Sequence, residues 1–278
     1  MNFRAVAAMA GVILACAVVM PANAVSAGAQ PGVSADAALA KAVRSPLRSP
    51  QFVARDRFRH PGRVLSFFGL KPGMTVVEIW PSGGYWTEIL APYAKATDGH
   101  YIAAVPSEKH PLPAKFEDKT VYGDITTTVF NDKSGPLVPP GTADLVLTFR
   151  NVHNWMGNPG MPEKAMADFY AALKPGGVLG LVEHRADPRP MVKDASDGYV
   201  STTYVIALAQ KAGFKLEDQS EINANPKDTK DYPFGVWTLP PTRLSGPEGG
   251  PQNPAFDHSK YDAIGESDRM TLRFRKPA

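Results

Sequence analysis

The sequence predicts an α/β fold built on a mostly parallel, seven-stranded β-sheet with helices on both faces. Between residues 75 and 219, apolar strand-like runs alternate with helix-like segments, which is the pattern of a parallel sheet. The run "ADLVLT" at residues 143–148 is continuously apolar apart from its ends and suits a strand buried on both faces. The last strand follows the sixth without a helix between them, so we expect an antiparallel strand at the C-terminal edge.

The elements can be assigned in order along the chain. Strands are predicted over residues 75–80, 99–105, 120–122, 143–148, 178–183, 214–219 and 268–277. Helices are predicted over residues 35–43, 63–68, 85–94, 163–173 and 198–212. Glycines and prolines mark helix ends, as in Pro175-Gly176-Gly177 after the fourth helix and Gly213 after the fifth.

The first 24 residues are predicted to be a secretory signal peptide. Arg4 gives a positive start, residues 5–20 are almost wholly apolar, and Ala22-Asn23-Ala24 offers a small-residue cleavage site. The apolar stretch is short for a membrane span. We therefore expect a periplasmic or secreted chain with no stable membrane span after cleavage. An uncleaved anchor, or lipidation at Cys16, is the alternative.

After cleavage, the chain is expected to contain a flexible leader over residues 25–50 and one domain over residues 51–278. A helical extension, 51–73, opens the domain, and an irregular insertion, 221–268, precedes its last strand. Cys16 is the only cysteine, which excludes disulfides and thiol chemistry from the mature chain. The net charge of +3 is spread without a long basic run, so we expect no nucleic-acid partner. Nothing in the sequence indicates an oligomeric state.

The turn after the first strand, "VVEIWPSGGYW" at residues 76–86, is the most informative motif. Glu78 interrupts the apolar strand, and a turn of small residues leads into a helix. Ligands of open α/β sheets bind beyond the carboxyl ends of the strands, where the strand order reverses. Glycine in such a turn lets the backbone approach a ligand closely. The sequence therefore predicts a ligand site at this turn.

Together with three further motifs, this turn resembles the class I S-adenosylmethionine-dependent methyltransferases. These motifs are "VYGD" ending at Asp124, "ADLVLTFRNVHNW" at residues 143–155 and "FYAALKPGGVLGLVEHR" at residues 169–185. More narrowly, "RDRFRHP", "EIWP" and "RNVHNW" resemble a group of bacterial methyltransferases predicted to be exported. The resemblance implies a Rossmann-like methyltransferase fold, S-adenosyl-L-methionine as cofactor and an unidentified small molecule as methyl acceptor.

The same resemblance assigns the cofactor contacts. Glu78 would orient the methionine part, Glu108 would reach the ribose and Asp124 would face the adenine amine. The remaining contacts would come from Trp80, Pro81, Ser82, Gly83, Gly84, Arg150 and Asn151. Two features depart from the family: Trp80 and Ser82 replace glycines, and Val105-Pro106 stands where an acid usually holds the ribose. Trp80 is either a core residue that supports the turn or a direct ligand contact. Glu108 and Asp124 are otherwise a solvated loop residue and a turn cap.

Two histidines are the catalytic candidates. His153 follows the fourth strand and is the best general base, because an unperturbed histidine titrates near neutrality. His184 follows the fifth strand. Methyl transfer needs a base only if the acceptor carries a proton, so a structural role for His153 is the alternative.

A metal site and a second function are also considered. His60, His153, His184 and Asp124 could converge on an ion, but they show no close ligand spacing, so we expect no metal. His60, Arg59 and Arg185 could line the mouth of the pocket, and Trp237 could form a lid over it. The alternative function is a non-catalytic ligand-binding protein of the cell envelope that keeps the fold, with Trp80 filling the cofactor site.

Overall fold

The structure, a computed structural model, describes residues 37–186 and 190–278 of the chain. These residues belong to one compact unit, Ala35–Ala278. The predicted signal peptide and the leader up to residue 36 lie outside the described residues. Within the described ranges, no helix has the length and apolar character needed to cross a membrane.

A seven-stranded sheet forms the centre of this unit, in the order β3-β2-β1-β4-β5-β7-β6. Strands β1 to β5 pair in parallel, and β7 pairs antiparallel with both β5 and β6. The predicted mostly parallel sheet is therefore confirmed, with the antiparallel last strand lying second from the edge. The strands are β1 (Thr75–Ile79), β2 (His100–Val105), β3 (Ile125–Val129), β4 (Ala143–Phe149), β5 (Leu173–His184), β6 (Lys215–Ser220) and β7 (Arg269–Arg275).

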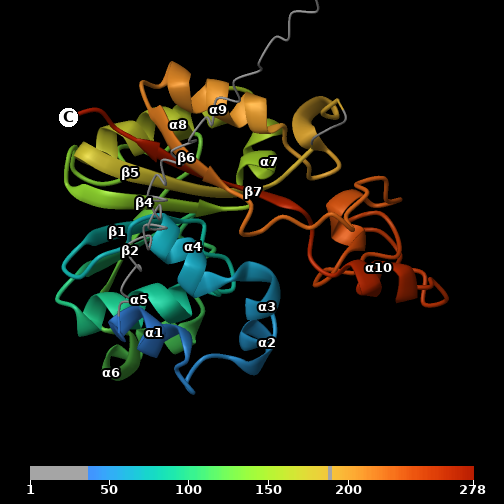
Figure 1. Cartoon of the computed structure of the whole chain (residues 1–278), viewed down its shortest axis with the longest axis horizontal. Coiled ribbons are helices and arrows are strands. Elements are labelled where there is room, and N and C mark those ends of the chain that lie inside the picture. The colour runs from blue at the N-terminus through green and yellow to red at the C-terminus, as the bar shows by residue number, and fades with distance from the viewer. Residues whose placement is uncertain (1–36, 187–189) are drawn as a thin grey trace, which may run out of the picture. The chain divides into compact units, whose positions relative to one another are not determined.

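Helices cover both faces of the sheet (Figure 1). On one face lie α1 (Ala37–Val43), α4 (Pro61–Phe67) and α5 (Thr87–Ala96), and on the other lie α8 (Met161–Ala172) and α9 (Thr202–Lys211). Each face has its own buried apolar cluster, and successive residues of β1 alternate between them: Val76 packs in the first and Val77 in the second. This alternation explains why the central strands are apolar on both sides.

The second half of the predicted leader packs onto the domain. Leu39 and Ala42 of α1 are buried in the same cluster as α5. Two short helices follow, α2 (Pro50–Val53) and α3 (Asp56–Arg59), and they lead the chain past the carboxyl end of β1 into α4.

The prediction of a strand over residues 120–122 is wrong. Lys119–Tyr122 form the short helix α6, because the Asp118 carboxylate accepts the backbone N–H of Thr120 at 2.9 Å and caps its first turn. Gly123, with a φ of 71°, follows the helix. The third strand is instead the β-branched run "ITTTV" of β3. Asp124 consequently precedes β3 and lies at the amino end of the strand, not at its carboxyl end.

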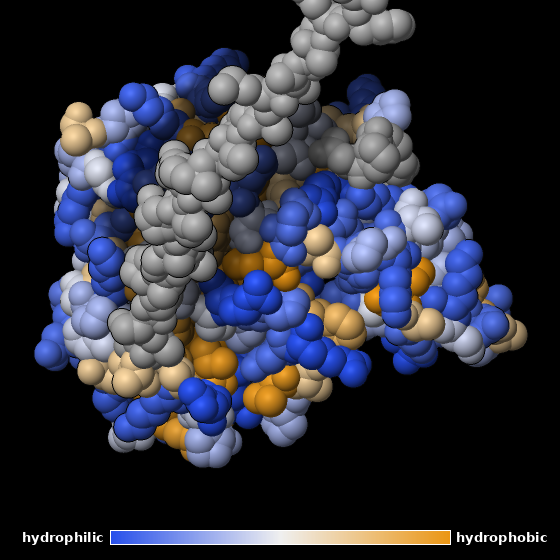
Figure 2. Space-filling view, in the orientation of Figure 1, coloured by the Kyte–Doolittle hydropathy of each residue, from blue (hydrophilic) through white to orange (hydrophobic). Residues whose placement is uncertain are grey.

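The segment between β6 and β7 is mostly irregular, as predicted, with a short 3₁₀ helix, η3 (Gly235–Thr238), and α10 (Ser259–Ile264). Two further 3₁₀ turns, η1 (Ala114–Glu117) and η2 (Lys193–Ala195), lie in loops. The face shown in Figure 2 is mainly hydrophilic. In the described part of the chain, the exposed large hydrophobic side chains are Leu47, Val53 and Val192.

Candidate functional site

A cavity of about 350 Å³ opens at the carboxyl ends of β1, β4 and β5. The strand order reverses between β1 and β4, so the cavity lies where ligands of open α/β sheets bind. The turn after β1, the residues after β4 and β5, helices α2 and α3, and the late segment around η3 supply its walls. The cavity therefore lies at the turn where the sequence predicts a ligand site.

The turn after β1 has an unusual backbone. Trp80, Ser82 and Gly84 have φ angles of 47°, 52° and 86°, in the left-handed region that favours glycine. Trp80 and Ser82 thus adopt a backbone conformation that glycine reaches without strain and other residues rarely adopt. Pro81, Ser82 and Gly83 line the cavity. Gly84 serves packing instead, because a Cβ at Gly84 would lie 2.2 Å from the ring of Phe116.

The Trp80 side chain extends from β1 toward the segment after β3. Its backbone N–H donates to the carbonyl of Ala104 in β2, and its indole N–H donates to the carbonyl of Phe130 at 2.8 Å. The ring contacts Trp155 edge-on, with centroids 6.0 Å apart. Trp80 also lines the cavity. Trp80 therefore packs against the core, as the first of the two roles considered from the sequence requires, and its place in the cavity wall leaves a ligand contact as a prediction.

Glu78 lies in β1 at the floor of the cavity and is 1% exposed. Its Oε2 accepts hydrogen bonds from the hydroxyl of Tyr101 at 2.6 Å and from that of Thr87 at 3.2 Å. Burial raises the pKa of Glu78 and the two hydrogen bonds lower it, with a net rise to about 7. Glu78 is therefore a carboxyl group that gains or loses its proton near neutral pH.

Arg150 and Asn151 follow β4 and both line the cavity. The Asn151 amide donates to the carbonyl of Ile79 at 2.8 Å, which ties the end of β4 to the end of β1. Arg150 has a φ of 61°. Its guanidinium makes no hydrogen bond or ion pair with any residue that the structure describes. Asn151 thus holds the two strands together, whereas the Arg150 guanidinium is free to contact a ligand.

His153 lies on α7 (Val152–Met156), a helix that is not among those predicted from the sequence. Its Nδ1 lies 2.9 Å from Oε1 of the buried Glu183, at the end of β5. Glu183 also accepts the backbone N–H groups of Val152 at 2.6 Å and His184 at 2.8 Å. Because a carboxylate only accepts hydrogen bonds, His153 donates through Nδ1 and presents Nε2 as an acceptor. This is the geometry of an oriented general base.

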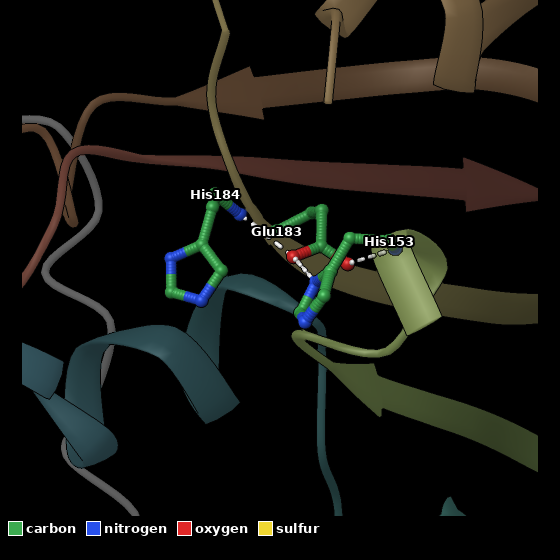
Figure 3. A group of neighbouring side chains, drawn as sticks. All are labelled: His153, Glu183 and His184. Carbon is green, nitrogen blue, oxygen red and sulfur yellow. Dashed lines mark hydrogen bonds and ion pairs between the residues drawn. The ribbon is translucent and has the colours of Figure 1, made fainter. Parts of the chain in front are cut away.

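His184 lies beside His153, with ring centroids 5.3 Å apart (Figure 3). Its Nδ1 lies 2.5 Å from the hydroxyl of Ser267, and no carboxylate holds its ring. Burial, followed by the charges of neighbouring groups including Arg150, keeps the pKa of His184 well below its usual value. A lowered pKa makes His184 a weaker proton acceptor, so His153 is the better candidate for the base.

His153, Glu183 and His184 also have possible metal-ligating atoms that all lie within 4.8 Å of one another. Both oxygens of Glu183 already accept hydrogen bonds, so this residue would bind an ion only in competition with them. Of the other residues weighed as ligands, Asp124 precedes β3, and His60 is not part of the cavity wall. These hydrogen bonds favour a hydrogen-bonded pair of His153 and Glu183 over a metal site.

We expect Glu183→Gln to lower the free energy of unfolding by about 1–3 kcal/mol, because the amide NH₂ would face a backbone N–H and leave a buried donor without an acceptor. Urea denaturation monitored by tryptophan fluorescence measures this change. Glu163→Gln, at an exposed position on α8, is the matched control and should change the free energy little. Equal effects of the two substitutions would show that Glu183 does not organise the end of β5.

Three residues predicted near the site lie elsewhere. Glu108 is exposed in the loop after β2 and does not line the cavity. The Asp124 side chain is 84% exposed and pairs with Lys119 at 2.7 Å. The assignment of Asp124 to the adenine is therefore not supported, because it depended on the misplaced third strand. Arg185 pairs with Glu221 and Asp268 outside the cavity.

Glu266 is a residue of the cavity lining that the sequence did not reveal, and it is 4% exposed. Its carboxylate pairs with Arg55 at 2.6 Å, Arg59 at 3.1 Å and Arg269 at 3.0 Å. Arg55 and Arg59 belong to the "RDRFRHP" motif, so half of this cluster was visible as a polar run. Trp237 of η3 also lines the cavity and contacts His153 edge-on, with ring centroids 5.9 Å apart.

No protein-family model and no curated protein matches the sequence. Solved structures do align with it. An S-adenosylmethionine-dependent methyltransferase from Aquifex aeolicus is 15% identical, over 86% of this chain and 98% of that one, with a TM-score of 0.52. The [4+2]-cyclase SpnF is 14% identical, over 79% and 81%, with a TM-score of 0.56. Phosphoethanolamine N-methyltransferase 2 of Haemonchus contortus, in complex with S-adenosyl-L-methionine, is 14% identical, over 87% and 60%, with a TM-score of 0.52.

At these identities the alignments show the fold. The chain has the Rossmann-like fold of class I methyltransferases, with the mixed seven-stranded sheet described above. The names of the aligned structures include a cyclase as well as methyltransferases, so the activity has to be argued from the site.

Proposed function

We propose that the protein is a methyltransferase that uses S-adenosyl-L-methionine to methylate a small molecule, and that it acts in the periplasm or as a secreted protein. The observation that carries this proposal is the cavity at the reversal of strand order, which is lined by Glu78, by the turn after β1 and by His153, whose ring is held by the buried Glu183. The export signal read from residues 1–24 is the sole support for the localisation.

Residues around this cavity fit the ammonium group of the cofactor's amino-acid part. Glu78 offers a carboxyl group for the ammonium. Ser82, with a small side chain, and Gly83, with none, leave room for a ligand at the turn after β1. When bound, the cofactor supplies an electrophilic methyl group. The protein supplies His153 to accept a proton from the acceptor, and Glu183 to orient His153.

The nucleoside part of the cofactor lacks the contact that the family resemblance implies, an acid at the end of β2. Val105 and Pro106 end β2 without an acid, and the Trp80 indole bonds to the carbonyl of Phe130 just after β3. The nucleoside would then pack against Trp80 rather than be held by a carboxylate. The same observation favours the second candidate, a non-catalytic ligand-binding protein, in which the indole closes the nucleoside site.

We expect Glu78→Gln to weaken S-adenosyl-L-methionine binding and to abolish its pH dependence. In the wild type, the affinity should rise as the pH increases through about 7, because the Glu78 carboxyl then ionises and can pair with the ammonium. Calorimetric titrations at about pH 6 and about pH 8 measure both effects.

Glu108→Gln is the control for this experiment, since Glu108 is exposed outside the cavity and its loss should leave the affinity unchanged. If Glu78→Gln binds the cofactor as tightly as the wild type at both pH values, Glu78 has no part in the site. If wild type and both variants bind none, the proposed activity itself fails.

A further inference from the structure

An excess of positive charge surrounds one side of the cavity. Arg55, Arg59 and Arg150 line it, and Arg269 lies behind them around a void of about 10 Å³ that Arg59 and Arg150 also border. Glu266 is the carboxylate that Arg55, Arg59 and Arg269 share. Four guanidinium groups therefore gather around one carboxylate at this wall. Glu183, a further carboxylate whose charge acts on Arg150, is already bonded to His153.

Several hydrogen-bond donors of this cluster have no partner. Nη2 of Arg55, Nη2 of Arg59 and Nε of Arg269 are buried without a hydrogen-bond acceptor in the described part of the chain. Arg59 is 2% exposed, and its guanidinium is held over the ring of Tyr85, 4.5 Å from the centroid. A buried donor without an acceptor destabilises the folded state, so such a cluster is stable only if something offsets that cost.

The pKa values of Arg59 and Arg150 also reflect the burial and mutual repulsion of these charges. Burial, and after it the charge of Arg150, lowers the pKa of Arg59 well below its usual range. Burial also lowers the pKa of Arg150, to about 10, where Glu266 opposes the fall and Arg55 adds to it. A bound anion would relieve this repulsion and would accept the free N–H groups.

Several aromatic side chains also line the cavity. Trp86 and Phe149 stack with centroids 4.0 Å apart, and both line the cavity with Phe52, Tyr85 and Trp237. The aromatic surface suits an apolar or planar ligand body, while the guanidinium fork matches the two oxygens of a carboxylate or phosphate. His153 lies on the same cavity, in contact with Trp237.

We propose that the methyl acceptor is an organic anion with an apolar body, whose carboxylate or phosphate is bound by Arg55, Arg59 and Arg150. The role of this anion as methyl acceptor rests on the proposed function. The binding of the anion does not. The cofactor carries a sulfonium cation, so an anionic acceptor balances the positive charge that the cavity would otherwise concentrate.

Isothermal titration of the purified chain with benzoate and with inorganic phosphate tests the site. We expect Arg150→Gln to weaken binding of the preferred anion by about 10–100-fold, because a charge-assisted pair is lost. The Arg150 guanidinium makes no hydrogen bond or ion pair with the described residues, and its backbone bond to Val182 is kept in the variant, so the replacement should leave the fold intact. Arg243→Gln removes an exposed guanidinium paired with Asp262, and is expected to bind as the wild type does.

Each titration is repeated with saturating S-adenosylhomocysteine. Anion binding that persists under those conditions and depends on Arg150 supports an acceptor site, and preference for benzoate or phosphate identifies the anionic group. The proposal is overturned if neither anion binds the wild type, if Arg150→Gln binds equally well, or if the cofactor product displaces the anion, since the arginines would then hold the cofactor's own carboxylate. If S-adenosylhomocysteine does not bind while Arg150-dependent anion binding remains, the proposed activity fails and the anion site stands.

Discussion

Replacing His153 with alanine is expected to lower turnover by about 10²–10⁴-fold for an acceptor whose nucleophile carries a proton. The Glu183 carboxylate holds Nδ1 of His153 at 2.9 Å, which leaves Nε2 to accept that proton. His184 cannot take over the role well, because its ring bonds to Ser267 rather than to a carboxylate. The measurement is the rate of S-adenosylhomocysteine release at saturating cofactor.

His100→Ala is the matched control, since His100 is exposed at the amino end of β2, away from the cavity. It should leave the rate unchanged. The thermal unfolding midpoint of His153→Ala must be measured alongside, so that loss of the fold is not taken for loss of the base. A correctly folded His153→Ala protein with undiminished turnover would contradict the assignment of His153 as the base.

Replacing Glu266 with alanine is expected to lower the free energy of unfolding by about 3–5 kcal/mol, because it leaves buried guanidinium groups without their shared carboxylate. Arg59, Arg269 and Glu266 are all less than 5% exposed, so water screens the lost pairs poorly. Urea denaturation at neutral pH measures the loss. Glu221→Ala, whose side chain is 69% exposed in its pair with Arg185, should cost less than about 1 kcal/mol.

The same carboxylate should make the wild type sensitive to acid. Burial raises the pKa of Glu266, but Arg59, Arg269, Arg55 and Arg150 outweigh it and lower the pKa to about 2. A lowered pKa in the folded state means that the contribution to stability is complete above the ordinary pKa of about 4.5 and is lost as the pH falls toward about 2. If Glu266→Ala and the wild type lose stability in parallel over that window, Glu266 does not anchor the arginine cluster.

The architecture could be predicted because it depends on local signals. The apolar runs of β1, β4 and β5 and the Gly-Pro helix ends identify alternating elements, and the parallel order places the ends of β1 and β4 together. Glu78, His153 and His184 were found for this reason, since each lies within or just after such a strand. The third strand was misplaced because the Asp118 cap turns a β-branched stretch into helix α6, a competition that a short run does not reveal.

The arginine cluster could be predicted only in part because its contacts are not local. Arg55 and Glu266 are 211 residues apart in the chain, and the segment around Glu266 carries no periodic pattern. Trp80 illustrates a different limit. Its position in the turn was evident from the sequence, but its direction depends on a φ of 47° and on a hydrogen bond to Phe130. Neither follows from residue identity.

The proposed activity requires that the altered turn after β1 still binds the cofactor, and calorimetry of the purified wild-type protein with S-adenosylmethionine and S-adenosylhomocysteine measures this. We expect binding in the micromolar range, with the cofactor's amino-acid part near Glu78 and its nucleoside against Trp80. If neither binds at millimolar concentration, the Trp80 indole closes the nucleoside site and the protein binds another ligand.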